Sequence, residues 1–177
     1  MEIITTTIDS PIGPLCAGAR DDGVCLLEFT APERLDPQLQ TLQRSLGGTL
    51  REGDHAHLRQ LRQELAAYFA GRLREFTVPV VAPGTPFQER VWSELRRIPY
   101  GQTRSYEDLA RVVSSASAQR AVGRANGSNR IAIVIPCHRV VNKNGGLGGY
   151  GGGLWRKEVL LRLEGAGPAQ LTLLAGQ

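Results

Sequence analysis

Hydrophobic and β-branched residues alternate with turn residues at the start of the chain. Apolar or threonine-rich runs at Glu2–Ile8, Leu15–Ala19 and Val24–Phe29 are separated by Asp9–Gly13 and Asp21–Gly23. Val, Ile and Thr favour strands, whereas Asp, Ser, Pro and Gly favour tight turns. The pattern therefore predicts three short strands in a small antiparallel sheet.

Leucines at helical spacing follow these strands. They recur every three or four positions over residues 35–46, and a second, clearer apolar face extends over residues 54–70. Gly47 and Gly71 stand just after these two segments, where a glycine commonly ends a helix. Two helices are therefore predicted to accompany the sheet.

A change of pattern at residues 78–84 indicates a domain boundary, because this segment places two prolines among valines. We predict an N-terminal α/β support domain over residues 1–82, a mainly helical domain over residues 83–165 and an uncharged, loosely ordered tail over residues 166–177. The expected fold class is α+β.

The second domain begins with a strong helix signal. Thr85 is suited to the N-cap, Pro86 to the first helical position, and Gln88 completes a capping box. Another helix is predicted from Ser105, and a third over residues 117–126 after a serine-rich turn. Two short helices joined by a tight turn indicate a helix-turn-helix, although many helical hairpins bind nothing.

Five apolar residues, Ile131–Ile135, precede Pro136 and Cys137. The run predicts a short buried strand that ends at Pro136, which has no N–H to donate. Cys137 would then follow a rigid element, with His138 beside it. Because the thiolate is the nucleophile, an imidazole neighbour is a means of activating Cys137. The alternative is an inert, buried structural cysteine.

Positive charge is concentrated in the second domain. Residues 1–82 carry 8 basic and 11 acidic side chains, whereas residues 83–165 carry 13 basic and 6 acidic ones. Arg120 and Arg124 are four positions apart and would share one exposed helical face. The charge excess favours a polyanion-binding surface, with a solvated basic face as the alternative.

Composition excludes several other classes of protein. No apolar run is long enough to span a membrane, and the N-terminus lacks a signal-peptide pattern. The cysteine count is three, which is odd, and nothing indicates secretion, so we expect reduced thiols and a cytoplasmic location. His55 and His57 are interpreted as surface residues, because that spacing does not place them on one helical face.

Residues 145–153 contain seven glycines and Tyr150. They do not form a phosphate loop, because no Gly-Lys-Ser/Thr follows. The segment is either a flexible connector or the wall of a site for a flat ligand, since glycine permits close backbone approach. A last helix is predicted over Leu154–Leu163, and it bears Glu158.

Several motifs, in order, resemble those of the O6-alkylguanine-DNA alkyltransferases, also called methylated-DNA–protein-cysteine methyltransferases. The turn at Asp9–Gly13 resembles the N-terminal turn of that family. The other matching motifs are Thr-Pro-Phe-Gln at 85–88, Ile-Pro-Tyr-Gly at 98–101, Ser-Tyr at 105–106, Arg-Ala-Val-Gly at 120–123, Asn-Gly-Ser-Asn at 126–129, Pro-Cys-His-Arg-Val at 136–140 and Lys-Glu at 157–158.

The resemblance implies a catalytic group of four residues. Cys137 is the alkyl acceptor, and His138 polarises it through a bound water. Glu158 holds His138 in orientation. Asn129 supports the turn that brings the recognition helix against the reactive cysteine.

The resemblance also implies a DNA-binding surface and a base pocket. Tyr106 presses on the phosphate of the target nucleotide, and Arg120 fills the gap left in the base stack as the helix-turn-helix enters the minor groove. The implied DNA-binding residues are Arg120, Tyr106, Arg124, Ala121, Gly123 and Ser128. The implied pocket residues are Tyr150, Gly151, Gly152 and Val140.

The implied reaction is irreversible, stoichiometric transfer of an alkyl group from O6-alkylguanine, and also from O4-alkylthymine, to Cys137. The target nucleotide must rotate out of the duplex, at a cost of a few kcal/mol. Since water does not readily hydrolyse a thioether, each molecule would act once. The expected partner is double-stranded DNA containing alkylated bases, with no membrane and no cofactor. The chain is expected to be monomeric, and cooperative binding along DNA stays open.

Two positions depart from the family pattern. Arg130 stands where many relatives have proline, and Gly151 where some have serine. Some relatives bind a structural zinc in the N-terminal region, but residues 1–8 contain no Cys or His. We therefore expect no metal.

Two other functions remain compatible with these residues. A transcriptional regulator could use the helix-turn-helix alone, and it would not need Cys137. A Cys-His hydrolase would turn over repeatedly on an acyl substrate and accumulate an acyl-enzyme.

Overall fold

The structure is a computed structural model that describes residues 1–166 and divides into two compact units. The first unit comprises residues 1–84 together with residues 130–132, and the second comprises residues 85–129 and the chain from Ile133 onward. The return of residues 130–132 to the first unit was not indicated by the sequence pattern. The predicted tail, apart from Ala166, lies outside the described residues.

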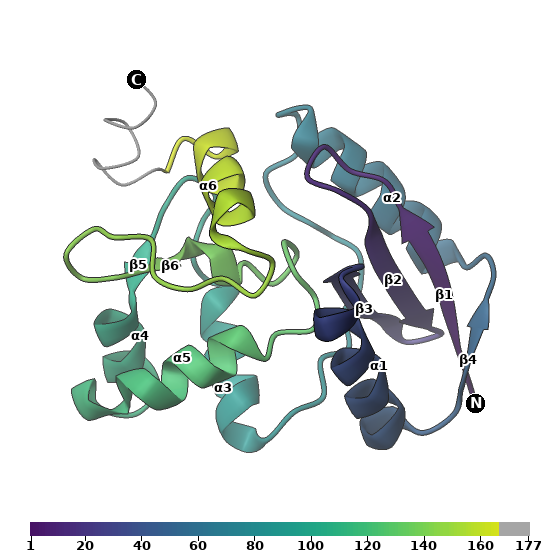
Figure 1. Cartoon of the computed structure of the whole chain (residues 1–177), viewed down its shortest axis with the longest axis horizontal. Helices are drawn as coiled ribbons and strands as arrows, with labels where there is room; N and C mark the ends of the chain where they lie inside the picture. The colour runs from purple at the N-terminus through teal and green to yellow at the C-terminus, as the bar shows by residue number, and fades with distance from the viewer. Residues whose placement is uncertain (167–177) are drawn as a thin grey trace. The chain divides into compact units, whose positions relative to one another are not determined.

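The first unit is built on a four-stranded sheet of order β3-β2-β1-β4 (Figure 1). The three predicted strands are confirmed, and neighbours among them pair antiparallel. A fourth strand pairs parallel to β1, so the sheet is mixed and not wholly antiparallel as predicted. This edge strand was missed because its sequence, Thr-Leu-Arg-Glu, contains one apolar residue. The strands are β1 (Glu2–Ile8), β2 (Leu15–Arg20), β3 (Gly23–Phe29) and β4 (Thr49–Glu52).

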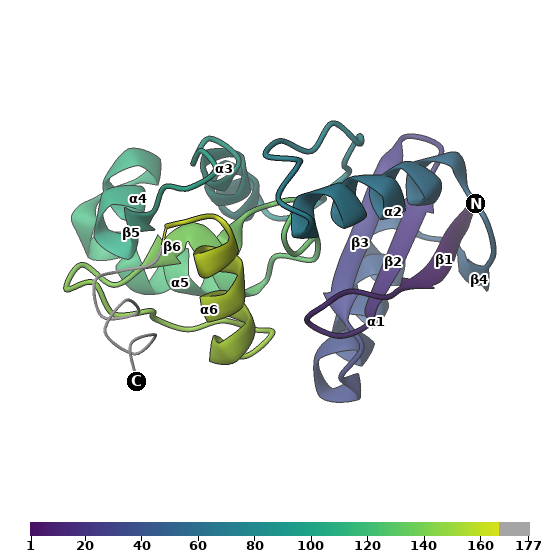
Figure 2. The same ribbon diagram turned by 90° about the horizontal axis from the view of Figure 1, so that it is seen from above.

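Two helices cover opposite faces of this sheet (Figure 2). Glu28 of β3 accepts a hydrogen bond from Arg34 of α1 at 3.0 Å. Thr6 of β1, whose side chain points to the other face, lies 3.5 Å from Arg62 of α2. The helices are α1 (Pro32–Leu46) and α2 (Ala56–Phe69). The buried core includes Ile3, Leu15, Leu26, Leu27, Phe29, Leu42, Leu61 and Tyr68.

The second unit contains the predicted helices in the predicted order. Helix α3 starts with the expected capping box, in which the Thr85 side chain accepts from the Gln88 N–H and the Gln88 side chain accepts from the Thr85 N–H. The Ser105 side chain caps α4 by accepting from the Asp108 N–H. Helix α5 follows α4 after one 3₁₀ turn, η1, and packs against both α3 and α4. Their bounds are α3 (Pro86–Leu95), α4 (Tyr106–Val113), η1 (Ala116–Ala118) and α5 (Gln119–Gly127).

A two-stranded parallel pair joins the start of α4 to the segment after Cys137. Strand β5 (Arg104–Ser105) pairs with β6 (Val140–Val141). Tyr106 comes directly after β5, and Cys137 lies shortly before β6. The reactive-cysteine segment forms the 3₁₀ turn η2 (Cys137–Arg139), and helix α6 (Leu154–Leu163) matches its predicted bounds. This pairing brings residues far apart in sequence to one place.

The predicted strand at Ile131–Ile135 is wrong. Ile131 makes one isolated bridge, to Leu27, and residues 132–134 form a turn. Ile133 adopts φ of +71°, a left-handed conformation that ends any extended pairing and is uncommon for a β-branched residue. All five residues are nevertheless buried. The apolar run therefore signals burial here and not a strand.

No helix within residues 1–166 combines the length and apolar character that crossing a membrane requires.

Candidate active site

Cys137 stands at a turn that exposes its side chain. The carbonyl of Ile135 accepts a hydrogen bond from the Cys137 N–H at 2.8 Å, and Pro136 has φ of −82° and ψ of 63°. These are the dihedrals and the bond of an inverse γ-turn. Cys137 is partly exposed, whereas every other residue from Ile131 to Val141 is buried. The turn thus presents one thiol from an otherwise closed segment.

The other two cysteines lie in the N-terminal sheet. Burial raises the pKa of the Cys16 thiol and raises that of Cys25 to about 12. Both thiols therefore resist conversion to thiolate. Cys16 is partly exposed like Cys137, so exposure alone does not separate them. Cys137 is the candidate nucleophile because it is the cysteine that adjoins the buried imidazole of His138.

Two asparagines from the end of α5 hold this turn. Asn129, which is buried, donates from Nδ2 to the Ile135 carbonyl at 2.8 Å. Asn126 donates from Nδ2 to the Cys137 carbonyl at 3.3 Å. The supporting role of Asn129 stays a prediction, and its hydrogen bond to Ile135 is the contact that fits it. Asn126 was not predicted, although it opens the same Asn-Gly-Ser-Asn motif and lies three positions before Asn129.

His138 is fully buried beside Cys137. Its Nε2 lies 2.8 Å from Oε1 of Glu164. Because a carboxylate only accepts, Nε2 must carry the proton and donate it. The other ring nitrogen, Nδ1, has no hydrogen-bond partner among the described residues. Burial lowers the pKa of His138, and Glu164 opposes this only in part. His138 is therefore a neutral base whose free lone pair is on Nδ1.

The carboxylate that orients His138 is Glu164, and the prediction of Glu158 was wrong. Glu158 pairs with Arg162 at 2.5 Å on a partly exposed side of α6. The buried residues of this helix are Lys157, Leu160 and Leu161. Glu164 continues that stripe at the i, i+3, i+4, i+7 spacing, whereas Glu158 falls outside it. The stripe could have identified Glu164 from the sequence.

Lys157 is buried and joins β6 to the glycine-rich segment. Its Nζ donates to the Val140 carbonyl at 2.6 Å and to the Gly149 carbonyl at 3.0 Å. Burial lowers the pKa of Lys157 to about 8, and Cys137, which is negatively charged when ionised, opposes the shift. No role for Lys157 was predicted from the sequence. A lysine on the apolar stripe of a helix was the available signal.

Tyr106 is the first residue of α4 and lies over the same segment. Its ring centroid is 6.0 Å from Lys157 Nζ, and Gly148 packs directly against the ring. Burial, followed by the charge of Cys137, raises the pKa of its hydroxyl. Tyr106 therefore forms part of the surroundings of Cys137.

The remaining predicted pocket residues lie along the same segment. Val140 is buried in β6, and Gly152 is buried with its carbonyl accepting from Arg156 at 2.8 Å. Tyr150 is partly buried, and its carbonyl accepts from the Gly153 N–H. Gly151 is exposed.

The predicted DNA-binding residues lie mainly on the outer side of α5. Arg120 and Arg124 are exposed, and Ala121 and Gly123 are partly exposed. A β-carbon built on Gly123 would meet no atom of residues 1–166 within 4 Å, so packing among these residues does not require a glycine there. Ser128 differs from these residues because its hydroxyl is engaged within the unit: it donates to the Ala125 carbonyl and accepts from Gln88 Nε2. These hydrogen bonds make it part of the C-terminal end of α5.

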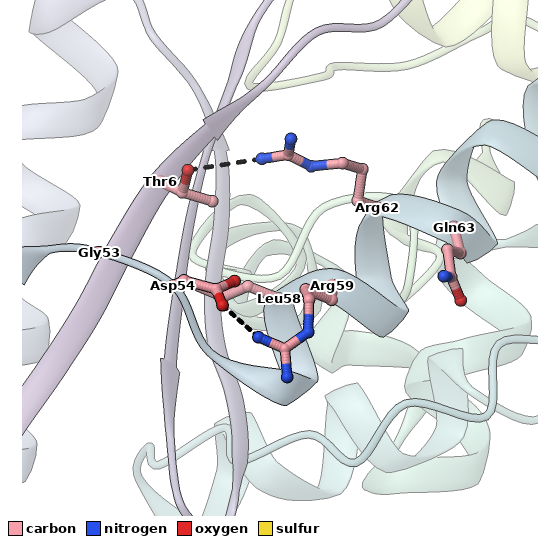
Figure 3. Close-up of a pocket in the computed structure, with 7 residues that line it drawn as sticks. All are labelled: Thr6, Gly53, Asp54, Leu58, Arg59, Arg62 and Gln63. Carbon is pink, nitrogen blue, oxygen red and sulfur yellow. Dashed lines mark hydrogen bonds and ion pairs between the residues drawn. The ribbon is translucent and has the colours of Figure 1, made fainter.

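The first unit contains a hollow of about 420 Å³ between β1 and α2 (Figure 3). Arg59 pairs there with Asp54, and Arg62 reaches Thr6. The arginines that line it are thus already engaged within the unit. Across residues 1–166 no group of three or more His, Cys, Asp or Glu is placed to hold a metal ion.

Comparisons with known proteins cover both units of the chain. The model for the 6-O-methylguanine DNA methyltransferase ribonuclease-like domain matches residues 3–82, and that for the DNA-binding domain of the same proteins matches residues 86–166. The chain belongs to the 6-O-methylguanine DNA methyltransferase family. The resemblance noted in the sequence is thereby confirmed.

Relatives in this family match almost the whole chain. A methylated-DNA–protein-cysteine methyltransferase of Mycolicibacterium paratuberculosis is 47% identical over 94% of this chain and 96% of the relative. The constitutive one of Bacillus subtilis is 39% identical over 90% and 93%. The Mycobacterium tuberculosis O6-methylguanine methyltransferase has a TM-score of 0.78 at 43% identity, covering 97% and 99%. A crystal structure of the Mycobacterium tuberculosis protein in complex with DNA has a TM-score of 0.77 at the same identity, covering 98% and 99%.

Proposed function

We propose that this chain repairs DNA by moving an alkyl group from O6-alkylguanine, and from O4-alkylthymine, in duplex DNA onto Cys137. The observation that carries the proposal is one accessible thiol beside a buried imidazole with a free Nδ1. The curated relatives are named for this activity. One chain acts as a monomer on one lesion, in the cytoplasm, where thiols stay reduced.

The chemical step uses the Cys137–His138–Glu164 arrangement. Nδ1 of His138 takes the thiol proton, through a water, and Glu164 stabilises the imidazolium that results. The sulfur then attacks the alkyl carbon and forms a C–S bond. The C–O bond breaks, its electron pair stays on the base oxygen, and the proton passes from His138 to the departing base. The products are unmodified guanine and a thioether.

Once the thioether has formed, Cys137 cannot accept a second alkyl group. An acyl-enzyme has a carbonyl that water can attack, whereas an S-alkyl cysteine has none. The reaction therefore runs once per chain.

Access to the lesion requires the nucleotide to leave the duplex. Helix α5 offers an exposed face with Arg120 and Arg124, and at Gly123 and Gly127 the described part of the chain leaves room for a β-carbon. A helix with small residues can approach the minor groove closely, and minor-groove contacts suit a protein that must search any sequence. Arg120 takes the place of the rotated base, and Tyr106 contacts its phosphate.

A duplex oligonucleotide bearing one O6-methylguanine tests the proposal. Incubation with excess oligonucleotide should add one methyl group per chain, and peptide mapping should place it on Cys137. The Cys137→Ser variant should bind the duplex but take up no methyl group. Label on another residue, or continued release of repaired DNA beyond one equivalent, would refute the proposal. Binding without any transfer would instead favour a regulator, and turnover of an acyl ester a hydrolase.

A further inference from the structure

Arg139 is a buried arginine whose three guanidinium nitrogens all donate hydrogen bonds, two of them to Glu164 of the candidate active site. Its Nε donates to Oε2 of Glu164 at 2.9 Å, and its Nη2 donates to Oε1 at 2.9 Å. Its Nη1 donates to the Ile98 carbonyl at 2.7 Å. The guanidinium carbon also lies 5.9 Å from the ring centroid of Tyr100. A planar fork held at three points is fixed more firmly than a single ion pair.

Glu164 therefore accepts hydrogen bonds from two side chains, His138 and Arg139. Its Oε1 accepts from Nε2 of His138 and from Nη2 of Arg139, while its Oε2 accepts from Nε of Arg139. The carboxylate cannot rotate without breaking the fork. The direction in which it faces the imidazole is therefore set by Arg139. The end of α6 that carries it is also anchored, because the Tyr100 hydroxyl donates to the Leu163 carbonyl at 3.1 Å.

The charges around His138 come from two elements. Arg139 on η2 and Lys157 on α6 lower the pKa of His138, in addition to the larger effect of burial, whereas Glu164 raises it. Burial would raise the pKa of Glu164, but hydrogen bonds from His138 and Arg139 outweigh burial and lower it to about 2. Cys137 adjoins His138, and Tyr106 faces Cys137. Arg139 is thus the cation that compensates the charge of Glu164.

We propose that Arg139 is a positioning residue for the alkyl transfer: it fixes Glu164 so that His138 keeps its proton on Nε2 and presents a bare Nδ1 to the thiol. This deepens the function proposed above and rests on it for its kinetic consequence. Without the guanidinium, Glu164 would face the imidazole as its remaining charged partner. His138 would then take up a second proton more readily, and an imidazolium cannot act as a base.

The pH dependence of transfer separates this role from a merely structural one. In single-turnover assays Arg139→Met should be about tenfold slower than wild type at about pH 6 and recover most of the difference at about pH 8. Arg139→Lys keeps the charge but loses the fork, so it should be slower by a similar factor at every pH. Arg162→Met is the matched control, because Arg162 also pairs with a glutamate of α6 but is far more exposed. Arg162→Met should leave the rate of transfer and its pH dependence unchanged.

Titration of the histidine side chains by NMR tests the inference without any transfer. The chain has three histidines, and His55 and His57 lie in the first unit as internal references. The His138 resonance should titrate at higher pH in Arg139→Met than in wild type. An unshifted His138 titration, or an Arg139→Lys variant as fast as wild type, would overturn the inference. If Arg139→Met does not fold, Arg139→Lys decides the matter by its rate.

Failure of the inference and failure of the proposed function give different results. A wild-type chain that never takes up an alkyl group contradicts the function, whatever the titration of His138 shows. A wild-type chain that transfers normally, with Arg139 variants that leave the profile and the titration unmoved, contradicts the inference alone.

Discussion

A β-carbon placed on Gly148 would lie 2.8 Å from a ring carbon of Tyr106 and 3.0 Å from its hydroxyl. Gly148 also has φ of +70°, a conformation that L side chains rarely adopt. The glycine-rich segment and α4 therefore fit together at one point without room for a methyl group. Because Tyr106 lies near Cys137, this contact affects the geometry of the site.

Gly148→Ala should slow alkyl transfer by about 10- to 100-fold, because it displaces Tyr106 from the reacting group. The matched control is Gly149→Ala, where a β-carbon would meet no described atom within 4 Å and φ is not positive. It should react at the wild-type rate. Single-turnover assays with methylated duplex DNA measure both. Equal rates for the two variants would show that the contact with Tyr106 is unimportant.

Substitutions of Glu158, within α6, and of Glu164, just after α6, should affect transfer and stability differently. Glu164→Gln removes the carboxylate that stabilises the imidazolium, so transfer should fall by about 100-fold. It also leaves Arg139 buried without its anion and should destabilise the fold by about 3–5 kcal/mol. Glu158→Gln removes a partly exposed pair and should change both quantities little. Rates and urea unfolding on the same preparations test this, and a large effect of Glu158→Gln would restore the original assignment.

Arg120→Ala should separate extrusion of the base from chemistry. It should reduce transfer from methylated duplex DNA by at least about tenfold, since nothing then fills the base stack. Its reaction with the free base O6-benzylguanine should match that of wild type, because no nucleotide has to rotate. Intact mass after timed exposure to each substrate gives both rates. Loss of the free-base reaction as well would place Arg120 in the pocket instead.

Lys157 should make stability depend on pH at alkaline values. Its folded-state pKa of about 8 lies below the value of about 10.4 for an unfolded lysine. Between these values the unfolded chain binds more protons, so the free energy of unfolding should rise with pH. Lys157→Met should lose this rise, which urea unfolding at several pH values measures. Lys143, the other lysine of the chain, is exposed, and Lys143→Met should retain the rise. Parallel curves for wild type and Lys157→Met would contradict the burial of a charged amine.

Local chemistry was enough to predict most elements of the fold. The capping box at Thr85 and Gln88, the apolar faces of the helices and the turn residues between β1, β2 and β3 all act within a few residues of one another. Sequence reasoning can follow such short-range interactions. Strand β4 was not predicted, because a short, largely exposed edge strand is specified by the pairing of its backbone with β1 and not by its side chains.

The reactive pair Cys137 and His138 was also visible in the sequence, since the two residues are adjacent. Their environment was not. The turn at Ile133, the choice of Glu164 over Glu158 and the fork from Arg139 depend on where α6 and α5 pack against η2. Sequence order thus determined which residues carry the chemistry. Only tertiary packing decided which carboxylate faces the imidazole, because hydrogen bonds between buried groups depend on distance and direction in space.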